Sequence, residues 1–370
     1  MNKRLLSLDV FRGATIAGMI LVNNPGDWGN VYAPLLHADW HGCTPTDLVF
    51  PFFLFIVGVS IALALSKRKE RGDNQAAIIK KILWRTLLIF AIGLFLNGFP
   101  FFNFSSIRIP GVLQRIALVY GISAFLFLKM DWKQLAGTGI GLLLFYWGLM
   151  TLLPTPDGHP PNLNPETNLG AWLDRTLLGG HLWSQSKVWD PEGLLSTLPA
   201  IVTSISGILT GLWLKSKTAV YQKLVGLFGF GVISVLLGLI WDLAFPINKQ
   251  LWTSSYVLYT SGIALFGLAL IYWLVDVLNH QKWTKPFVIY GTNALFVFVL
   301  SGLIAKSLYY IKVKGTSGDT ISLKTWIYEG FFTPLFSNPM NASLAFALAN
   351  VLLLLGLSWI LYWNRIFIKV

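Results

Sequence analysis

Long apolar segments alternate with short polar ones along almost the whole chain. Ten of these segments have the length and apolar character of a membrane-spanning helix, which needs about 20 residues. They lie at residues 10–24, 46–66, 82–100, 111–129, 134–153, 191–213, 219–240, 252–275, 286–304 and 341–363. The pattern predicts an all-α, polytopic integral membrane protein with about ten transmembrane helices. Residues 1–370 are expected to form a single transmembrane domain.

The composition supports this prediction. Of the 370 residues, 55% are hydrophobic and only 12% are charged, whereas about a quarter of the residues of a soluble domain are charged. The net charge of +12 would suggest a nucleic-acid partner in a soluble chain. In a membrane protein the preference of Lys and Arg for cytoplasmic connections explains it, so we expect no nucleic-acid partner. The one cysteine excludes an intrachain disulfide framework and a multi-thiolate metal site.

The positions of Lys and Arg predict the orientation in the membrane. Asp9 and Arg12 interrupt what could otherwise be the apolar region of a signal peptide, so we interpret the N-terminal segment as the start of the first helix. The positive-inside rule then places both termini in the cytoplasm, in a multi-pass protein of the cell inner membrane. Most of the basic residues fall on the cytoplasmic side in this orientation: Lys3, Arg4, the run 67–81, Lys129, Lys133, Lys215, Lys217, Lys223, Lys282, Lys285, Arg365 and Lys369.

The stretch LLHADWHGCTPTDLVFPFF, residues 35–53, places polar side chains directly before an apolar helix, on the predicted outer side. Thr44 as N-cap, Pro45 as first helical residue and Asp47 as third give a variant of the capping box. Asp47 therefore has two interpretations, a helix cap or a functional carboxylate. His37 lies before the helix and is a candidate catalytic residue. His37 and His41 lack the third ligand of a metal site, so we expect no metal.

Two further segments carry basic residues at the outer ends of predicted helices. RIPGVLQR contains Arg108, just before a helix, and Arg115, within its first turns. The fork of a guanidinium suits phosphate or pyrophosphate, whereas snorkelling to the interface is the alternative for Arg108. FPINKQLWTSSY places Asn248 and Lys249 at the mouth of another helix.

Polar residues elsewhere have simple structural interpretations. Asp9 and Arg12 are spaced for an i,i+3 ion pair, with a role near a bound substrate as the alternative. Asp190, followed by Pro191, is expected to cap the helix at 191–213. Asn293 lies inside the helix at 286–304, where hydrogen bonding between helices is expected.

Several of these segments, taken together and in order, resemble a known family. The segments are SLDVFRG, LVNN, HADWHGCTPTDLVFPFFLFIVGVSI, RIPGVLQR, DPEGLLSTLPAIV, FPINKQLWTSSYVLYTSG and GTNALFVF, and they span about residues 6–300. They are similar to the transmembrane acyltransferases related to heparan-α-glucosaminide N-acetyltransferase. The chain looks like a shorter bacterial form without the N-terminal lumenal domain of the lysosomal enzyme.

The resemblance implies transfer of acetyl from cytoplasmic acetyl-CoA to the amine of a glucosamine-type sugar on the other side of the membrane. The family motif H-A-x-W-x-G places the catalytic histidine at His37. Position 41 is asparagine in the lysosomal enzyme, which implies that His41 is not the base. The asparagine of the V-N turn corresponds to Asn23, although the spacing to His37 is longer here, and the acidic residue at the helix start corresponds to Asp47.

The chemistry of these residue types fits such a reaction. Histidine is a natural general base near neutral pH, and Asp47 would orient its ring. Asn23 would donate to the oxyanion of the tetrahedral intermediate. In the alternative, ping-pong route, His37 is itself acetylated. We expect Arg108, Arg115, Lys249 and Asn248 to bind CoA. The expected partners are acetyl-CoA, a small amino-sugar acceptor and the lipid bilayer, and a second copy of the chain is a candidate partner.

Two competing functions use the same features. A secondary transporter for amino sugars would suit the short first helix and the polar groups within the membrane. An acyltransferase that modifies an envelope glycan or a lipid-linked sugar would keep the chemistry and change the acceptor.

Overall fold

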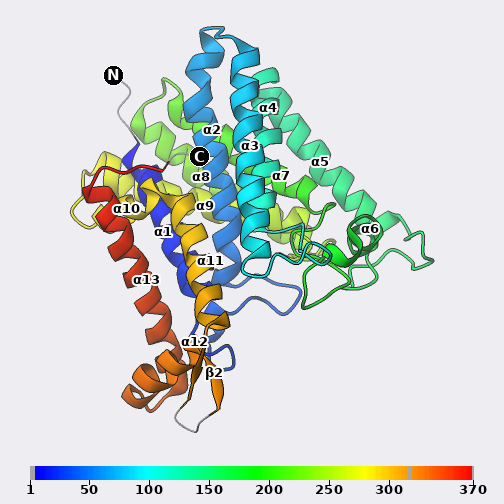
Figure 1. The fold of residues 1–370 in the computed structure, drawn as a ribbon. Coiled ribbons are helices and arrows are strands. Elements are labelled where there is room, and N and C mark those ends of the chain that lie inside the picture. The colour runs from blue at the N-terminus through cyan, green and yellow to red at the C-terminus, as the bar shows by residue number, and fades with distance from the viewer. Residues whose placement is uncertain (1–4, 316–318, 369–370) are drawn as a thin grey trace.

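The computed structural model describes residues 5–315 and 319–368. Lys3, Arg4 and Lys369, which contribute to the charge asymmetry of the sequence, lie outside these ranges. The described chain is built from helices of very different length (Figure 1). They are α1 (Leu6–Asn23), α2 (Val49–Glu70), α3 (Gln75–Gly98), α4 (Val112–Lys129), α5 (Trp132–Leu152), α6 (Leu169–Leu178), α7 (Thr197–Lys215), α8 (Val220–Asp242), α9 (Ser254–Tyr272), α10 (Lys285–Thr292), α11 (Ala294–Tyr310), α12 (Leu323–Ile327) and α13 (Pro339–Trp363).

Short turns and one small hairpin complete the described fold. The 3₁₀ turn η2 (Pro45–Leu48) leads into α2, and the π-helical turn η4 (Trp273–Val277) extends α9. The strands β1 (Lys312–Lys314) and β2 (Thr320–Ser322) pair in antiparallel register, with Val313 opposite Ile321.

The helices confirm the prediction of an all-α polytopic membrane protein. Within the described residues, eight helices are long and apolar enough to cross a membrane, and nine are if the bent pair α10–α11 counts as one span. The 24 residues of α3 reach about 36 Å at 1.5 Å per residue, but α3 is not among these eight. Each of the ten predicted segments thus corresponds to a helix or to the bent pair.

The centre of the bundle is the tight pair α2 and α7. A Cβ atom on Gly58 of α2 would lie 1.9 Å from the carbonyl oxygen of Ser204, and one on Gly207 of α7 would lie 2.0 Å from that of Phe55. The two backbones are therefore as close as glycine allows, a device common between membrane helices. This close approach fixes α2, which positions the functional site at one end and a cavity along its length.

The basic connections gather at one end of the bundle, where the turn between α2 and α3 stands at the top of Figure 1. Lys215 Nζ donates to Glu70 Oε1 over 2.9 Å, and Lys129 Nζ donates to Gln75 Oε1 over 2.9 Å. These contacts join the α7–α8 and α4–α5 connections to the α2–α3 turn. We call this end the basic end. The segment that contains His37 precedes α2 and so lies at the opposite end.

Two predicted helices differ from those observed. α7 begins at Thr197, not at residue 191, so the prediction that Asp190 caps it is wrong. Residues 190–196 instead form turns whose polar groups bind Arg108 and Arg115. The helix predicted at 286–304 is broken at Asn293, where α10 and α11 meet at 83°. Asn293 bonds not to another helix but to the segment after α13: its Nδ2 donates to Ile366 O over 3.0 Å, and its Oδ1 accepts from Ile368 N over 2.8 Å.

Candidate active site

Asp47 is fixed by the local structure that the sequence predicts. Thr44 and Asp47 form the expected capping box at the start of η2. Asp47 Oδ2 accepts hydrogen bonds from Thr44 N (3.0 Å), Thr44 Oγ1 (3.0 Å) and Ala38 N (3.1 Å). With only 1% of its side chain exposed, this carboxylate has one oxygen committed to the cap, which leaves Oδ1 for another partner.

That partner is His37. Its Nδ1 lies 2.6 Å from Asp47 Oδ1, although the two residues are ten positions apart. A carboxylate only accepts hydrogen bonds, so in the neutral imidazole this short contact places the ring proton on Nδ1 and leaves Nε2 as an acceptor. The His37 side chain is 40% exposed. The pair therefore presents a basic nitrogen, oriented by a buried carboxylate, at the surface of the end opposite the basic end.

Lys249 completes this group from a distant part of the chain. Its Nζ lies 3.2 Å from both ring nitrogens of His37 and 3.8 Å from Asp47 Oδ1. The connection between α8 and α9 is joined to the His37 segment by a hydrogen bond from Gly42 N to Ile247 O of 2.7 Å. Burial lowers the pKa of Lys249, and the charge of Asp47 partly offsets this effect.

Asn248 shapes the connection that carries Lys249. It is fully buried. Its Oδ1 accepts from Leu251 N over 2.8 Å and its backbone N–H donates to Thr253 Oγ1 over 3.0 Å. Its Nδ2 lies 3.4 Å from His41 Nδ1. These contacts are those of a residue that holds a loop in shape.

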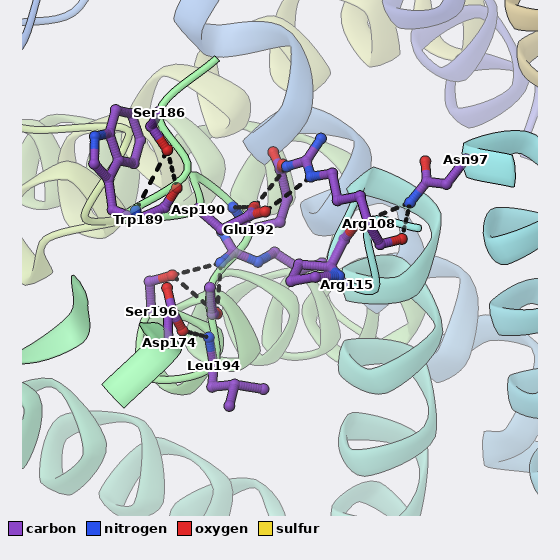
Figure 2. A network of polar contacts seen from close by, with 12 residues as sticks. Asn97, Arg108, Arg115, Asp174, Ser186, Trp189, Asp190, Glu192, Leu194 and Ser196 are labelled. Atoms are coloured by element: carbon purple, nitrogen blue, oxygen red, sulfur yellow. Dashed lines mark hydrogen bonds and ion pairs between the residues drawn. The ribbon is translucent and has the colours of Figure 1, made fainter. Parts of the chain in front are cut away.

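Arg108 lies in an ionic cluster with the turns at 190–196 (Figure 2). Its Nε donates to Asp190 Oδ2 over 2.8 Å, and its Nη2 donates to Asp190 Oδ1 and Glu192 Oε2. Burial alone would lower the pKa of Arg108, but the hydrogen bonds and charges of these two carboxylates raise it above its usual range. Burial alone would raise the pKa of Glu192, but the charges of Arg108 and Arg115 lower it. The guanidinium of Arg108 thus has two carboxylate partners within the chain.

Arg115 is buried below this cluster, with 1% of its surface exposed. Its Nη2 donates to Gly193 O over 3.0 Å and also to Ser196 Oγ (Figure 2). Its guanidinium lies 5.2 Å from the centre of the Trp252 ring, a cation–π distance. Arg115 therefore links the turns at 190–196 to Trp252, three residues after Lys249.

Asn23, the third predicted catalytic residue, is not part of the hydrogen-bonded group of His37 and Asp47 among the described residues. It is the last residue of α1 and is exposed, and among the described residues no hydrogen bond joins it to His37. Its neighbour Asn24 is buried and donates to Ile20 O over 2.8 Å. The place of Lys249 beside His37 could not be read from spacing, since 212 residues separate the two.

A cavity of about 490 Å³ lies on the basic side of the site. On α2 its lining runs from Phe53 to Arg68, which is about 22 Å along the helix axis. Basic side chains from three helices face it: Arg12 and Arg68, and from α3 Lys81 and Arg85. Arg12 forms the predicted ion pair with Asp9, over 3.1 Å, and also donates to Ser60 Oγ over 2.9 Å. The described lining includes no acidic residue.

We name the group at His37 the outer site and the cavity the inner cavity, after the orientation that the sequence predicts, and the two regions supply different chemistries. The outer group can accept a proton at His37 Nε2 next to a cationic side chain. The inner cavity can hold a long, polyanionic molecule against several cations. Within the described residues, no group of three His, Cys, Asp or Glu side chains could hold a metal ion.

Comparison with known proteins gives the family. Residues 4–167 match the model of the catalytic region of heparan-α-glucosaminide N-acetyltransferase. The human enzyme of that name is 31% identical over 317 residues, which are 71% of this chain and 47% of the human protein. The mouse enzyme is 31% identical over 323 residues, 71% of this chain and 48% of its own length. An uncharacterised 39.9 kDa protein of Bacillus acidopullulyticus is 29% identical over 158 residues, 39% of this chain and 40% of that protein.

The chain spans about half the length of the human and mouse relatives that it matches. The matched catalytic region contains the capping box and His37 in full. The apolar helices are those of a multi-pass membrane protein. From the motifs, the fold and these matches together, the chain belongs to the transmembrane acyltransferase family related to heparan-α-glucosaminide N-acetyltransferase.

Proposed function

We propose that this chain transfers the acetyl group of cytoplasmic acetyl-CoA to the amine of a glucosamine-type sugar on the other side of the inner membrane, with His37 as general base. The observation that carries the proposal is the 2.6 Å contact between His37 Nδ1 and the buried Asp47. It fixes the tautomer in which Nε2 can accept a proton, and it stabilises the imidazolium that follows.

The amine nitrogen attacks the thioester carbonyl carbon while His37 Nε2 accepts the proton that the amine loses. The carbonyl oxygen becomes an oxyanion, and the C–S bond then breaks to release the CoA thiolate, which takes the proton from the imidazolium. In the alternative, ping-pong route, His37 carries the acetyl group between the two substrates.

Lys249 is the better placed of the two candidates for oxyanion stabilisation. Its ammonium lies 3.2 Å from His37, whereas Asn23 is exposed at the end of α1. A cation held next to the reacting carbonyl stabilises the charge that develops there, an effect worth about 10²- to 10³-fold for one donor. Asn23 keeps the role that the family resemblance implies as a second candidate. We therefore assign Lys249 to the reaction centre and not to the CoA site.

The inner cavity is the better supported site for CoA. CoA carries a pyrophosphate and a ribose phosphate, and Arg68, Lys81 and Arg85 line a cavity long enough to hold it extended. Arg108, also a candidate, has its guanidinium bound by Asp190 and Glu192, and Arg115 is buried over Trp252. We propose that these two arginines hold the turns at 190–196 and Trp252 in place and do not bind CoA directly.

A matched pair of variants tests the CoA site. Lys81→Ala removes a cation that lines the cavity, whereas Lys80→Ala removes the adjacent one, which does not. A charge-assisted contact is worth about 1.5–3 kcal/mol, so KM for acetyl-CoA should rise about 10- to 100-fold in the first variant only. An equal rise in KM in both variants would refute the proposal that CoA binds in the inner cavity.

Activity tests the reaction itself. Purified protein with acetyl-CoA and glucosamine should release free thiol and form the N-acetyl sugar. His37→Ala should abolish both, whereas His41→Ala, four residues away on the same exposed segment, should retain them. Full activity of folded His37→Ala would refute the proposed base. A panel of envelope glycans and lipid-linked sugars, read by mass spectrometry, tests the alternative acceptors. Sugar flux into vesicles without acetyl-CoA would indicate a transporter.

A further inference from the structure

The inner cavity and the outer site lie close together along η2 and α2, and the cavity lining includes neither His37 nor Asp47. Asp47 holds His37 at the outer end, and Phe53 is the first residue of α2 in the cavity lining. Six residues of helix rise about 9 Å, so fewer than two turns separate them. Phe50 occupies the turn between, is 7% exposed and does not line the cavity.

Phe50 belongs to a stack of three buried aromatic rings at this level. Phe50 and Trp252 have ring centres 5.1 Å apart at 79°, and Trp252 and Tyr256 have ring centres 5.3 Å apart at 80°. Trp252 and Tyr256 are 1% and 0% exposed. Edge-to-face stacks of this kind are a favourable packing for aromatic rings. We call Phe50, Trp252 and Tyr256 the aromatic partition.

The partition is attached directly to the reaction centre. Tyr256 Oη donates to the backbone oxygen of Asp47 over 2.6 Å. Trp252 N donates to the backbone oxygen of Lys249 over 3.1 Å. The Tyr256 side chain is therefore bonded to the backbone of Asp47, and the backbone of Trp252 to that of Lys249.

Trp252 is held in an unusual backbone conformation. Its φ is +53°, in the left-handed region that a bulky residue rarely adopts. Its indole Nε1 donates to Thr203 Oγ1 over 3.1 Å, and Arg115 lies over its ring. Backbone strain of this kind persists where surrounding contacts enforce it, often at functional sites. The contacts of Trp252 with α4, α7 and the Lys249 connection all serve to hold the ring in this layer.

We propose that the aromatic partition closes the path between the inner cavity and His37 in the resting chain and limits the transferred acyl group to a short one. The acyl group that reaches His37 from the cavity must pass these three rings, so each added methylene meets the ring edges. The limit on acyl length rests on the proposed function, whereas the closure does not.

Thiol labelling tests the closure without any catalysis. Cys43 is the one native cysteine, so Cys43→Ser provides a background in which Val57→Cys marks the cavity and Lys80→Cys reports the basic end. In sealed vesicles, a membrane-impermeant maleimide should label Val57→Cys only from the side that labels Lys80→Cys. Adding Phe50→Ala should allow labelling from the opposite side as well. Labelling from both sides with the rings intact, or from one side after Phe50→Ala, would overturn the closure.

Acyl selectivity tests the second half of the proposal. Wild-type protein should use acetyl-CoA well and butyryl-CoA poorly, and Phe50→Ala should raise the ratio of kcat/KM for butyryl-CoA to that for acetyl-CoA by about 10-fold or more. An unchanged ratio would overturn the limit on acyl length. Phe50→Leu, a smaller truncation, should shift the ratio in the same direction and serves if Phe50→Ala fails to fold. A wild type without acetyl transfer would refute the proposed function and leave the labelling result standing.

Discussion

Replacing Asp47 by asparagine separates its two interpretations, because the two side chains differ by one acceptor. Asp47 accepts four hydrogen bonds: one from His37 at Oδ1, and three from Ala38 and Thr44 at Oδ2. An asparagine keeps one oxygen and replaces the other by a donor. It can therefore serve the cap or His37, but not both.

The structure decides which partner is lost. If the amide group faced Ala38 and Thr44, two backbone N–H groups would lose their acceptor beside a side chain that is 1% exposed, at about 1–3 kcal/mol each. The oxygen should therefore stay with the cap. The amide N–H₂ then faces His37 Nδ1, which must become the acceptor, and the ring proton moves to Nε2. A protonated Nε2 cannot accept a proton from the amine.

We expect Asp47→Asn to lower kcat by about 10²- to 10⁴-fold, the range of general base catalysis. The same replacement in the triad of a serine protease costs about 10⁴-fold for the same reason. KM for acetyl-CoA should be nearly unchanged. The deficit should shrink at high pH, where hydroxide can accept the proton that the attacking amine loses. Release of free thiol is measured with glucosamine present at several acetyl-CoA concentrations and several pH values. It reports kcat, KM for acetyl-CoA and the pH dependence of the loss.

Thr44→Val is the matched control for the cap. It removes the hydroxyl that contacts Asp47 Oδ2 and Leu36 O but leaves the contact between Asp47 and His37 intact. We expect a loss of about 1 kcal/mol in stability and only a small change in kcat. If both variants lost activity in proportion to their stability, Asp47 would be a cap alone and the reasoning would be refuted.

Three further predictions concern stability and reactivity. Burial, together with the charge of Asp190, raises the pKa of Asp174 from 3.8 to about 6. Stability that is present below pH 4 should thus fall by up to about 3 kcal/mol as the pH rises through 6, and Asp174→Asn should remove this part of the slope in unfolding experiments. Burial and the charge of Asp47 raise the pKa of Cys43 from 9.0 to about 12. Iodoacetamide at pH 8 should therefore react about 1000-fold more slowly with Cys43 in the folded chain than in the unfolded chain. Equal rates would contradict this prediction. Gly13→Ala would place a Cβ atom 1.8 Å from a backbone oxygen of α10 and should cost about 3 kcal/mol or more, whereas Gly18→Ala, with 3.7 Å to its nearest contact, should melt like wild type.

Much of the fold follows from local sequence signals. Hydropathy finds the helices because each must bury its own backbone polar groups within the bilayer. The capping box at Thr44 and Asp47 is likewise a local pattern, and it is confirmed. The ion pair between Asp9 and Arg12 follows from helical spacing and is confirmed as well.

Features that depend on distant parts of the chain could not be predicted in this way. Asp190 has the spacing of a helix cap, yet it binds Arg108, 82 positions away, and the helix starts later. Asn293 lies in an apolar run that gives no sign of an 83° bend. The ionic cluster and the inner cavity draw their side chains from several helices, so only the packing of those helices brings them together.

Sidedness tests the central claim most directly. Purified protein is placed in sealed vesicles. Acetyl-CoA labelled in the acetyl group is added on the side of the α2–α3 turn, and glucosamine is added only on the opposite side. The account predicts labelled N-acetylglucosamine on the glucosamine side, free CoA on the first side, and neither product with His37→Ala. Product that appears only when both substrates share one side would contradict the account.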